Sequence, residues 1–260
     1  MSALILRYLF LYTRNPVRLI ELIFWPLVDL LVWGFLTTYL QGQGEGDFPT
    51  TITFLIGGMI LWDVLYRSQQ GVAISFLEDV WTRNLLNIFV APVRTIEYVA
   101  ATCAVGLLRV GVTFSILGIV AALAYAFHIT HLGLALLPFM VNLMLFGWFL
   151  GMVSTALIMR WGQAAESLAW AVPFFIQPLA AVFYPVSVLP AWLQPIAMSL
   201  PCTPIFEGMR AVLSGGSMPW GLLQSAFILN LIWGLLAAWF FASNLRHVRK
   251  TGLLVKVATQ

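Results

Sequence analysis

Ionisable side chains stand inside long apolar segments of this chain, and these residues are the best placed to do chemistry. Asp29, Asp63 and Arg109 each lie near the middle of such a segment, and Arg67 and Gln70 follow Asp63 at helical spacing. A charge at the centre of a bilayer costs at least about 2.5 to 3.5 kcal/mol, so we expect these groups to face protein or water and to pair with one another. Two interpretations stay open: buried ion pairs that lock the helices, and a polar wall of a substrate path.

Other residue combinations give weak signals for chemistry. His128 and His131 are three positions apart, but no Cys, Asp or Glu lies close by in sequence to complete a metal site. The chain has no Gly-x-x-x-x-Gly-Lys-Ser/Thr, and its only lysines are Lys250 and Lys256, so it is not its own ATPase. We expect no catalytic residue, no metal and no cofactor in this chain.

Six apolar segments position these residues. The composition is 61% hydrophobic and 9% charged, and each segment is long enough, or nearly so, to cross a hydrocarbon core that needs about 20 helical residues. The polar stretches are too short to form a separate domain, since domains rarely fall below about 50 residues. The sequence therefore predicts an all-α integral membrane protein, a single domain over residues 1–260, with transmembrane helices at 22–40, 52–77, 98–127, 132–159, 168–188 and 222–244.

The basic residues alternate between the segments and predict the topology. Loops on one side hold ten of the thirteen Lys and Arg residues, while the loops of opposite parity hold only Arg210, and Arg67 and Arg109 lie within segments. Cytoplasmic loops are enriched in Lys and Arg, so both termini should be cytoplasmic. We attribute the net charge of +3 to loops that face anionic lipid and expect no nucleic-acid binding. The ten are Arg7, Arg14, Arg18, Arg83, Arg94, Arg160, Arg246, Arg249, Lys250 and Lys256.

The residues before the first segment predict an amphipathic helix over 1–20 that lies along the membrane surface. Arg7, Arg14 and Arg18 fall within a narrow arc on a helix, with leucines in other directions. Pro16 should bend the chain near Asn15, because proline lacks an N–H and clashes with the preceding turn. The helix either anchors the orientation of the chain or touches a partner, and the sequence favours neither.

The loop between the second and third segments predicts a short amphipathic helix over 81–92. Charged residues cluster at the two ends of this loop, and apolar residues between them end at Pro92. An exposed apolar face marks either a protein contact or contact with lipid, and the residues alone leave both readings open.

The region around the fifth segment predicts a broken helix. Five prolines lie from Pro185 to Pro204, and prolines free backbone carbonyls that lipid cannot satisfy. We expect the span to end near Tyr184 and a re-entrant helical hairpin to follow over 190–214. Glu207 and Arg210, three residues apart, should be neighbours on its returning helix.

These motifs resemble the ABC type-2 export permeases, and the resemblance covers essentially the whole chain. Acidic residues, then Arg and Asn, a Leu-Leu pair and a Pro before a basic residue are typical of the coupling helix of that family. A Phe-Tyr-Pro, a Leu-Pro-x-Trp-Leu, a following Pro201 and a later Arg are typical of its hairpin. Ala180 and Ala181 replace the usual Ser-Gly, and Pro204 is extra, so the bend of the hairpin is not fixed by the motif. The matching coupling residues are Glu78, Asp79, Arg83, Asn84, Leu85, Leu86, Pro92 and Arg94, and Trp81 lies among them.

The resemblance implies a permease subunit of the bacterial cytoplasmic membrane that pairs with a second permease copy and two ABC ATPase subunits. ATP and Mg would then be held by the ATPase partner, and the substrate would be a glycan, a lipid or a drug-like molecule. The residues give a rival, a membrane scaffold or an intramembrane enzyme with a broken-helix site. They do not identify the cargo, nor whether the pair is a homodimer or a heterodimer. The resemblance places an exit gate at Tyr184, Pro185, Leu189, Pro190, Trp192, Leu193, Glu207 and Arg210.

Overall fold

The structure is a computed structural model that describes residues 2–41 and 48–251, and in this part of the chain all regular elements are helices. Four stretches are long and apolar enough to cross a membrane: Pro16–Tyr39, Thr95–Tyr125, Ile129–Trp161 and Trp220–Thr251. The chain is therefore a helical membrane protein, and the predicted all-α class is confirmed. The prediction of six crossings stays a prediction, because it also needs the helices Phe48–Trp81 and Glu166–Leu179 to cross.

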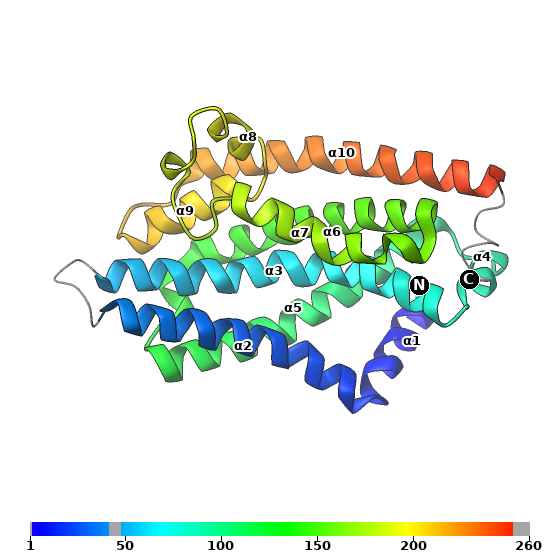
Figure 1. Cartoon of the computed structure of the whole chain (residues 1–260), viewed down its shortest axis with the longest axis horizontal. Coiled ribbons are helices and arrows are strands. Elements are labelled where there is room, and N and C mark those ends of the chain that lie inside the picture. The colour runs from blue at the N-terminus through cyan, green and yellow to red at the C-terminus, as the bar shows by residue number, and fades with distance from the viewer. Residues whose placement is uncertain (1, 42–47, 252–260) are drawn as a thin grey trace.

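The long helices lie side by side along one axis (Figure 1). They are α2 (Pro16–Gln41), α3 (Phe48–Trp81), α5 (Thr95–Tyr125), α6 (Leu136–Trp161) and α10 (Trp220–Thr251). A shorter helix, α7 (Glu166–Leu179), runs beside α3 and α6. Its 14 residues span only about 21 Å, less than a hydrocarbon core of about 30 Å. α3 is long enough to cross, but it carries four charged residues, at positions 63, 67, 78 and 79.

Short elements gather at the two ends of this bundle. α1 (Ser2–Thr13) and α4 (Leu85–Val90) lie at the end where α10 also finishes, whereas α8 (Gln194–Met198) and α9 (Thr203–Leu213) lie at the other (Figure 1). The remaining turns of helix are η1 (Ile129–Ala135), η2 (Gly162–Ala165) and η3 (Val186–Val188). The first helix and the end of the last helix therefore lie at the same end of the bundle as α4, which we call the α4 end.

The N-terminal helix is shorter than predicted. The expected break near Asn15 is confirmed, because α1 ends at Thr13 and α2 begins at Pro16. A single helix over 1–20 is therefore wrong: Arg14 lies in the connection and Arg18 in the first turn of α2. Proline is tolerated in that first turn because its missing N–H would have no helical partner there.

The second predicted transmembrane helix, α3, is longer than predicted, whereas α4, the helix in the loop that follows it, is shorter. α3 continues past residue 77 to Trp81, so α4 occupies only residues 85–90 of the expected 81–92. The break comes from Arg83, which has a φ of 53°, and from Asn84, whose N–H donates to the Asp79 carbonyl at 3.0 Å. Such a left-handed residue commonly ends a helix.

The fifth segment differs most from its prediction of a helix over 168–188. α7 ends at Leu179, and Ala181 has a φ of 52°. The guanidinium of Arg210 donates to the carbonyls of Ala181 and Val182, at 2.9 and 3.3 Å, and so satisfies groups that a continuing helix would have used. The expected hairpin over 190–214 contains the helices α8 and α9, and Pro204 fits in the first turn of α9, while the re-entrant course of this segment stays a prediction.

Glycines bring α3 close to its neighbours. A Cβ at Gly71 of α3 would lie 2.6 Å from the backbone nitrogen of Gly106 of α5, and one at Gly147 of α6 would lie 2.7 Å from the Cβ of Ser68. Small residues of this kind let helices approach within a membrane. Side-chain amides add cross-links: Gln69 donates to the Ala169 carbonyl at 2.9 Å, joining α3 to α7.

Substitution of Gly71 tests this packing. We expect Gly71→Ala to lower the free energy of unfolding by about 1 to 3 kcal/mol, because the added methyl group forces α3 and α5 apart. Gly118→Ala is the matched control, since nothing lies within 4 Å of its added Cβ. The melting temperature of each purified variant in detergent measures the effect. Equal melting temperatures for the two variants would contradict the close α3–α5 contact.

Candidate functional site

A cleft of about 780 Å³ opens between α2, α3, α5 and α7, with one residue from α1. Its lining combines charged and amide side chains with aromatic rings, so it is suited to an amphipathic molecule. The predicted intramembrane residues Asp29, Arg67, Gln70 and Arg109 all line this cleft. Its other lining residues are Tyr12, Arg18, Glu21, Leu22, Trp25, Tyr66, Ile74, Glu78, Trp81, Trp170 and Phe174.

A polar stripe along α3 contributes Arg67 and Gln70 to one wall of the cleft, whereas Asp63, the third member of the stripe, does not line it. Arg67 Nε lies 3.0 Å from Asp63 Oδ1, and Arg67 Nη1 donates to Gln70 Oε1 at 2.8 Å. All three side chains are buried, so each charge is stabilised by its neighbour and not by water. The predicted stripe of Asp63, Arg67 and Gln70 is therefore confirmed.

Arg109 faces the same cleft without an acidic partner. Its side chain is only 7% exposed, and its guanidinium lies 4.9 Å from the ring centroid of Tyr12. Among the described residues it makes no ion pair, and its Nε has no hydrogen-bond partner. The predicted pairing of Arg109 with Asp29 or Asp63 is therefore wrong. Asp63 pairs instead with Arg67, which lies one turn away on α3.

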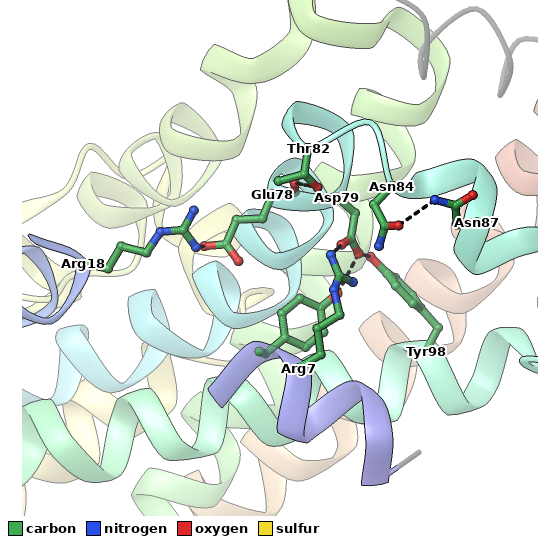
Figure 2. A network of polar contacts seen from close by, with 9 residues as sticks. Arg7, Arg18, Glu78, Asp79, Thr82, Asn84, Asn87 and Tyr98 are labelled. Atoms are coloured by element: carbon green, nitrogen blue, oxygen red, sulfur yellow. Dashed lines mark hydrogen bonds and ion pairs between the residues drawn. The ribbon is translucent and has the colours of Figure 1, made fainter. Parts of the chain in front are cut away.

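A second polar cluster surrounds Asp79 near the end of α3 (Figure 2). Its fully buried carboxylate accepts hydrogen bonds from the phenols of Tyr8 and Tyr98, at 2.7 and 2.8 Å, and pairs with Arg7 at 2.5 Å. Tyr8 and Arg7 belong to α1 and Tyr98 to α5. One carboxylate thus joins three helices directly before α4 begins.

The surroundings of Arg7 and Tyr8 determine the protonation states of these two α1 side chains. Burial and the Asp79 carboxylate both raise the pKa of the Tyr8 phenol well above its usual value, so Tyr8 remains a donor. Burial lowers the pKa of Arg7, but the charge of Asp79, its hydrogen bond and the neighbouring phenols of Tyr8 and Tyr98 together outweigh burial, so the net shift of this pKa is upward. Both α1 side chains therefore stay in the form that binds Asp79 across the physiological pH range.

Glu78 extends the cluster to α2. Its Oε1 lies 2.8 Å from Arg18 Nη1, so α2 is held to the same turn of α3 (Figure 2). Both Glu78 and Asp79 are buried within the chain, where they position helices and do not present an exposed docking face. Their predicted direct contact with a partner is thus not available in this arrangement.

The other predicted coupling residues surround α4 at the surface. Trp81 is exposed and donates to Glu166 at 3.2 Å, and Arg83, Pro92 and Arg94 are also exposed. Asn84 caps the start of α4, where its side chain accepts from Asn87 at 3.0 Å. The backbones of Leu85 and Leu86 belong to α4, but their side chains lie outside the described residues.

The predicted exit-gate residues lie at the opposite end of the bundle (Figure 1). The Tyr184 phenol donates to the Pro178 carbonyl at 2.5 Å, which closes the chain back onto the end of α7. Glu207 accepts from the Val186 N–H at 2.7 Å and lies 2.9 Å from Arg210, so the predicted Glu207–Arg210 pair is confirmed. Of the other predicted gate residues, Pro185, Pro190 and Trp192 are exposed, and Leu189 and Leu193 are half-buried, so their part in an exit gate stays a prediction.

Sequence reasoning missed the aromatic partners of these charges. Tyr8 and Tyr98 lie 71 and 19 residues from Asp79, and Tyr12 is far from Arg109. The only signal was a tyrosine within an otherwise apolar run, which is also typical of membrane-interface residues. Only the packing of α1 against α5 shows which of these tyrosines binds a charge.

Comparison with known proteins adds a relationship to this geometry. No protein-family model matches the chain. The chain is 24% identical over 198 residues to the inner membrane transport permease YadH of Escherichia coli K12, covering 71% of this chain and 72% of that protein. It matches YadH of Escherichia coli O157:H7 and of Shigella flexneri to the same extent. The chain is thus similar to transport permeases over most of its length.

Neutralising Asp79 tests the anchoring of α1. We expect Asp79→Asn to destabilise the attachment by about 2 to 4 kcal/mol, somewhat less than a fully buried ion pair, because Arg7 is partly exposed. Hydrogen exchange of the α1 amides at residues 2–13 measures the attachment and should become faster. Glu21→Gln is the control, since this exposed carboxylate has no ion pair among the described residues. Unchanged protection of α1 in Asp79→Asn would refute the anchoring role.

Proposed function

We propose that this chain is the membrane-spanning permease subunit of an ATP-driven ABC exporter in the bacterial cytoplasmic membrane. The similarity to inner membrane transport permeases supports a transport role. The observation that carries the proposal is the exposed helix α4, held between two long helices at the end where the basic residues gather. The chain itself is not catalytic in this proposal.

The distribution of charge supports a cytoplasmic location for the α4 end, with six crossings and both termini inside. Arg83 and Arg94 flank α4, and Arg160 lies in the last turn of α6. Arg249 and Lys250 lie in the last turn of α10, where Arg249 is 3.4 Å from Thr95 at the start of α5. Basic residues are enriched on the cytoplasmic side of membrane proteins, which favours this orientation.

In this proposal α4 docks into an ABC ATPase subunit, which holds the ATP and Mg. Val90 of α4 is 84% exposed, and the exposed Trp81, Arg83 and Arg94 flank α4 in the sequence. An apolar centre with a charged rim is the usual composition of a protein interface. Two ATPase copies would bind two permease copies, so closure of the ATPases would bring the two α4 helices together.

Movement of α4 would reach the cleft through α3 and α5. The Asp79 cluster joins both helices to α1 beside α4, and the glycine contact at Gly71 holds them together further along. A rigid pair of helices transmits displacement because packed cores do not deform continuously. The cargo, a glycan, a lipid or a drug-like molecule, would leave past Tyr184 and the segment formed by α8 and α9.

A charge on α4 tests this function. We expect Val90→Asp to reduce the amount of ATPase subunit that copurifies with the tagged chain by at least about tenfold, because an unpaired charge in an interface costs about 2 to 5 kcal/mol. Mass spectrometry of the complex purified from native membranes measures the ratio of ATPase to permease.

The matched control is Val188→Asp, the same change at an exposed valine at the opposite end of the bundle. It should retain the ATPase at the parent level. Recovery of the parent chain with no nucleotide-binding subunit would contradict the proposal. That result would favour the rival reading of a scaffold or an intramembrane enzyme.

A further inference from the structure

We propose that the cleft between α2, α3, α5 and α7 binds an amphipathic molecule with an anionic headgroup, and that Arg109 holds the anion. This proposal deepens the transport function and rests on it for its biological meaning. The binding itself is a property of this chain alone and is testable without an ATPase. The anion is a phosphate, sulfate or carboxylate, all of which a guanidinium binds through parallel hydrogen bonds.

Arg109 is the lining group that most needs a ligand. It lies about 21 Å along α5 from Thr95, well inside the long helix, at about 1.5 Å per residue. Burial of an unpaired cation at such a depth is costly, and groups of this kind usually mark a functional site. Its Nε and the Tyr12 hydroxyl are both buried without a hydrogen-bond partner in the described part of the chain. The Arg109 Nε–H and the Tyr12 hydroxyl are therefore two neighbouring hydrogen-bond donors without an acceptor among the described residues.

The other cations of the cleft are already paired. Arg67 is bound by Asp63, and Arg18 is bound by Glu78. Two further carboxylates, Glu21 and Asp29, also line the cleft, and both residues are exposed. They make no ion pair with Arg109, and an incoming anion would meet one buried cation whose charge no described residue neutralises.

Aromatic side chains provide the apolar half of the site. Trp25 of α2 and Trp170 and Phe174 of α7 line the cleft with exposed rings. A free ion would gain nothing from these aromatic side chains, whereas a hydrocarbon chain or fused ring would pack against them and bury their exposed surface. The volume of about 780 Å³ falls within the range of about 300 to 1,000 Å³ for small-molecule sites. The ligand class is therefore an anionic amphiphile.

Isothermal titration of the purified chain in neutral detergent tests the proposal with three probes. Dodecyl phosphate carries both the anion and the chain, dodecanol carries the chain alone, and inorganic phosphate carries the anion alone. We expect dodecyl phosphate to bind at least about tenfold more tightly than either of the others. Equal affinity for dodecanol would show that Arg109 does not select an anion. Equal affinity for inorganic phosphate would exclude the apolar part of the site.

Two variants assign the binding to these residues. Arg109→Gln should weaken dodecyl phosphate binding at least about tenfold, while Trp170→Ala should weaken it about threefold or more and leave inorganic phosphate unaffected. Arg160→Gln, an exposed arginine outside the cleft, is the control and should bind as the parent does. Parent-like binding by Arg109→Gln, or an equal loss in the control, would overturn the assignment.

The parent titrations decide the question even if Arg109→Gln does not fold. They also separate this proposal from the transport function. Binding of dodecyl phosphate by a chain that recovers no ATPase would leave the site intact and refute only the exporter. An ATPase complex whose chain binds none of the three probes would refute only the site.

Discussion

The constraint on which the rest of this structure depends is that every charge on α3 must find its partner inside the chain. α3 is the central helix of the bundle, and its acidic and basic residues cannot be solvated by lipid. Asp63 is satisfied by Arg67 within the helix, whereas Asp79 takes its partners from α1 and α5. The first solution leaves a polar wall in a cleft, and the second fixes the position of α4.

These two sites lie on one rigid element. The Asp63 stripe and the Asp79 cluster are separated by about 24 Å of α3, at about 1.5 Å per residue, and between them Gly71 packs against Gly106 of α5. A helix pair in such close contact moves as a body. The proposed coupling needs no moving element other than α3 and α5, because a displacement of α4 also displaces the cleft residues that these two helices carry.

The sequence was informative wherever the partners are local. The Asp63–Arg67 and Glu207–Arg210 pairs follow from one helical turn, and the break before α2 follows from Pro16. Contacts between distant segments decided the rest. α7 ends early because the Arg210 guanidinium donates a hydrogen bond to the Ala181 carbonyl. These two residues are 29 positions apart, so the spacing of nearby residues does not predict this contact. For the same reason the burial of Glu78 and Asp79 was not foreseen, and a motif alone placed them on a docking surface.

The central claim is that the α4 end faces the cytoplasm and the α8–α9 end faces outward. Single cysteines at Ser214 and His247, both exposed and at opposite ends of the bundle, report on it in a chain whose Cys103 and Cys202 are replaced. An impermeant thiol reagent applied to intact cells should label Ser214→Cys, and His247→Cys only after the membrane is opened. Labelling of His247→Cys in intact cells, with Ser214→Cys protected, would invert the chain and contradict the account.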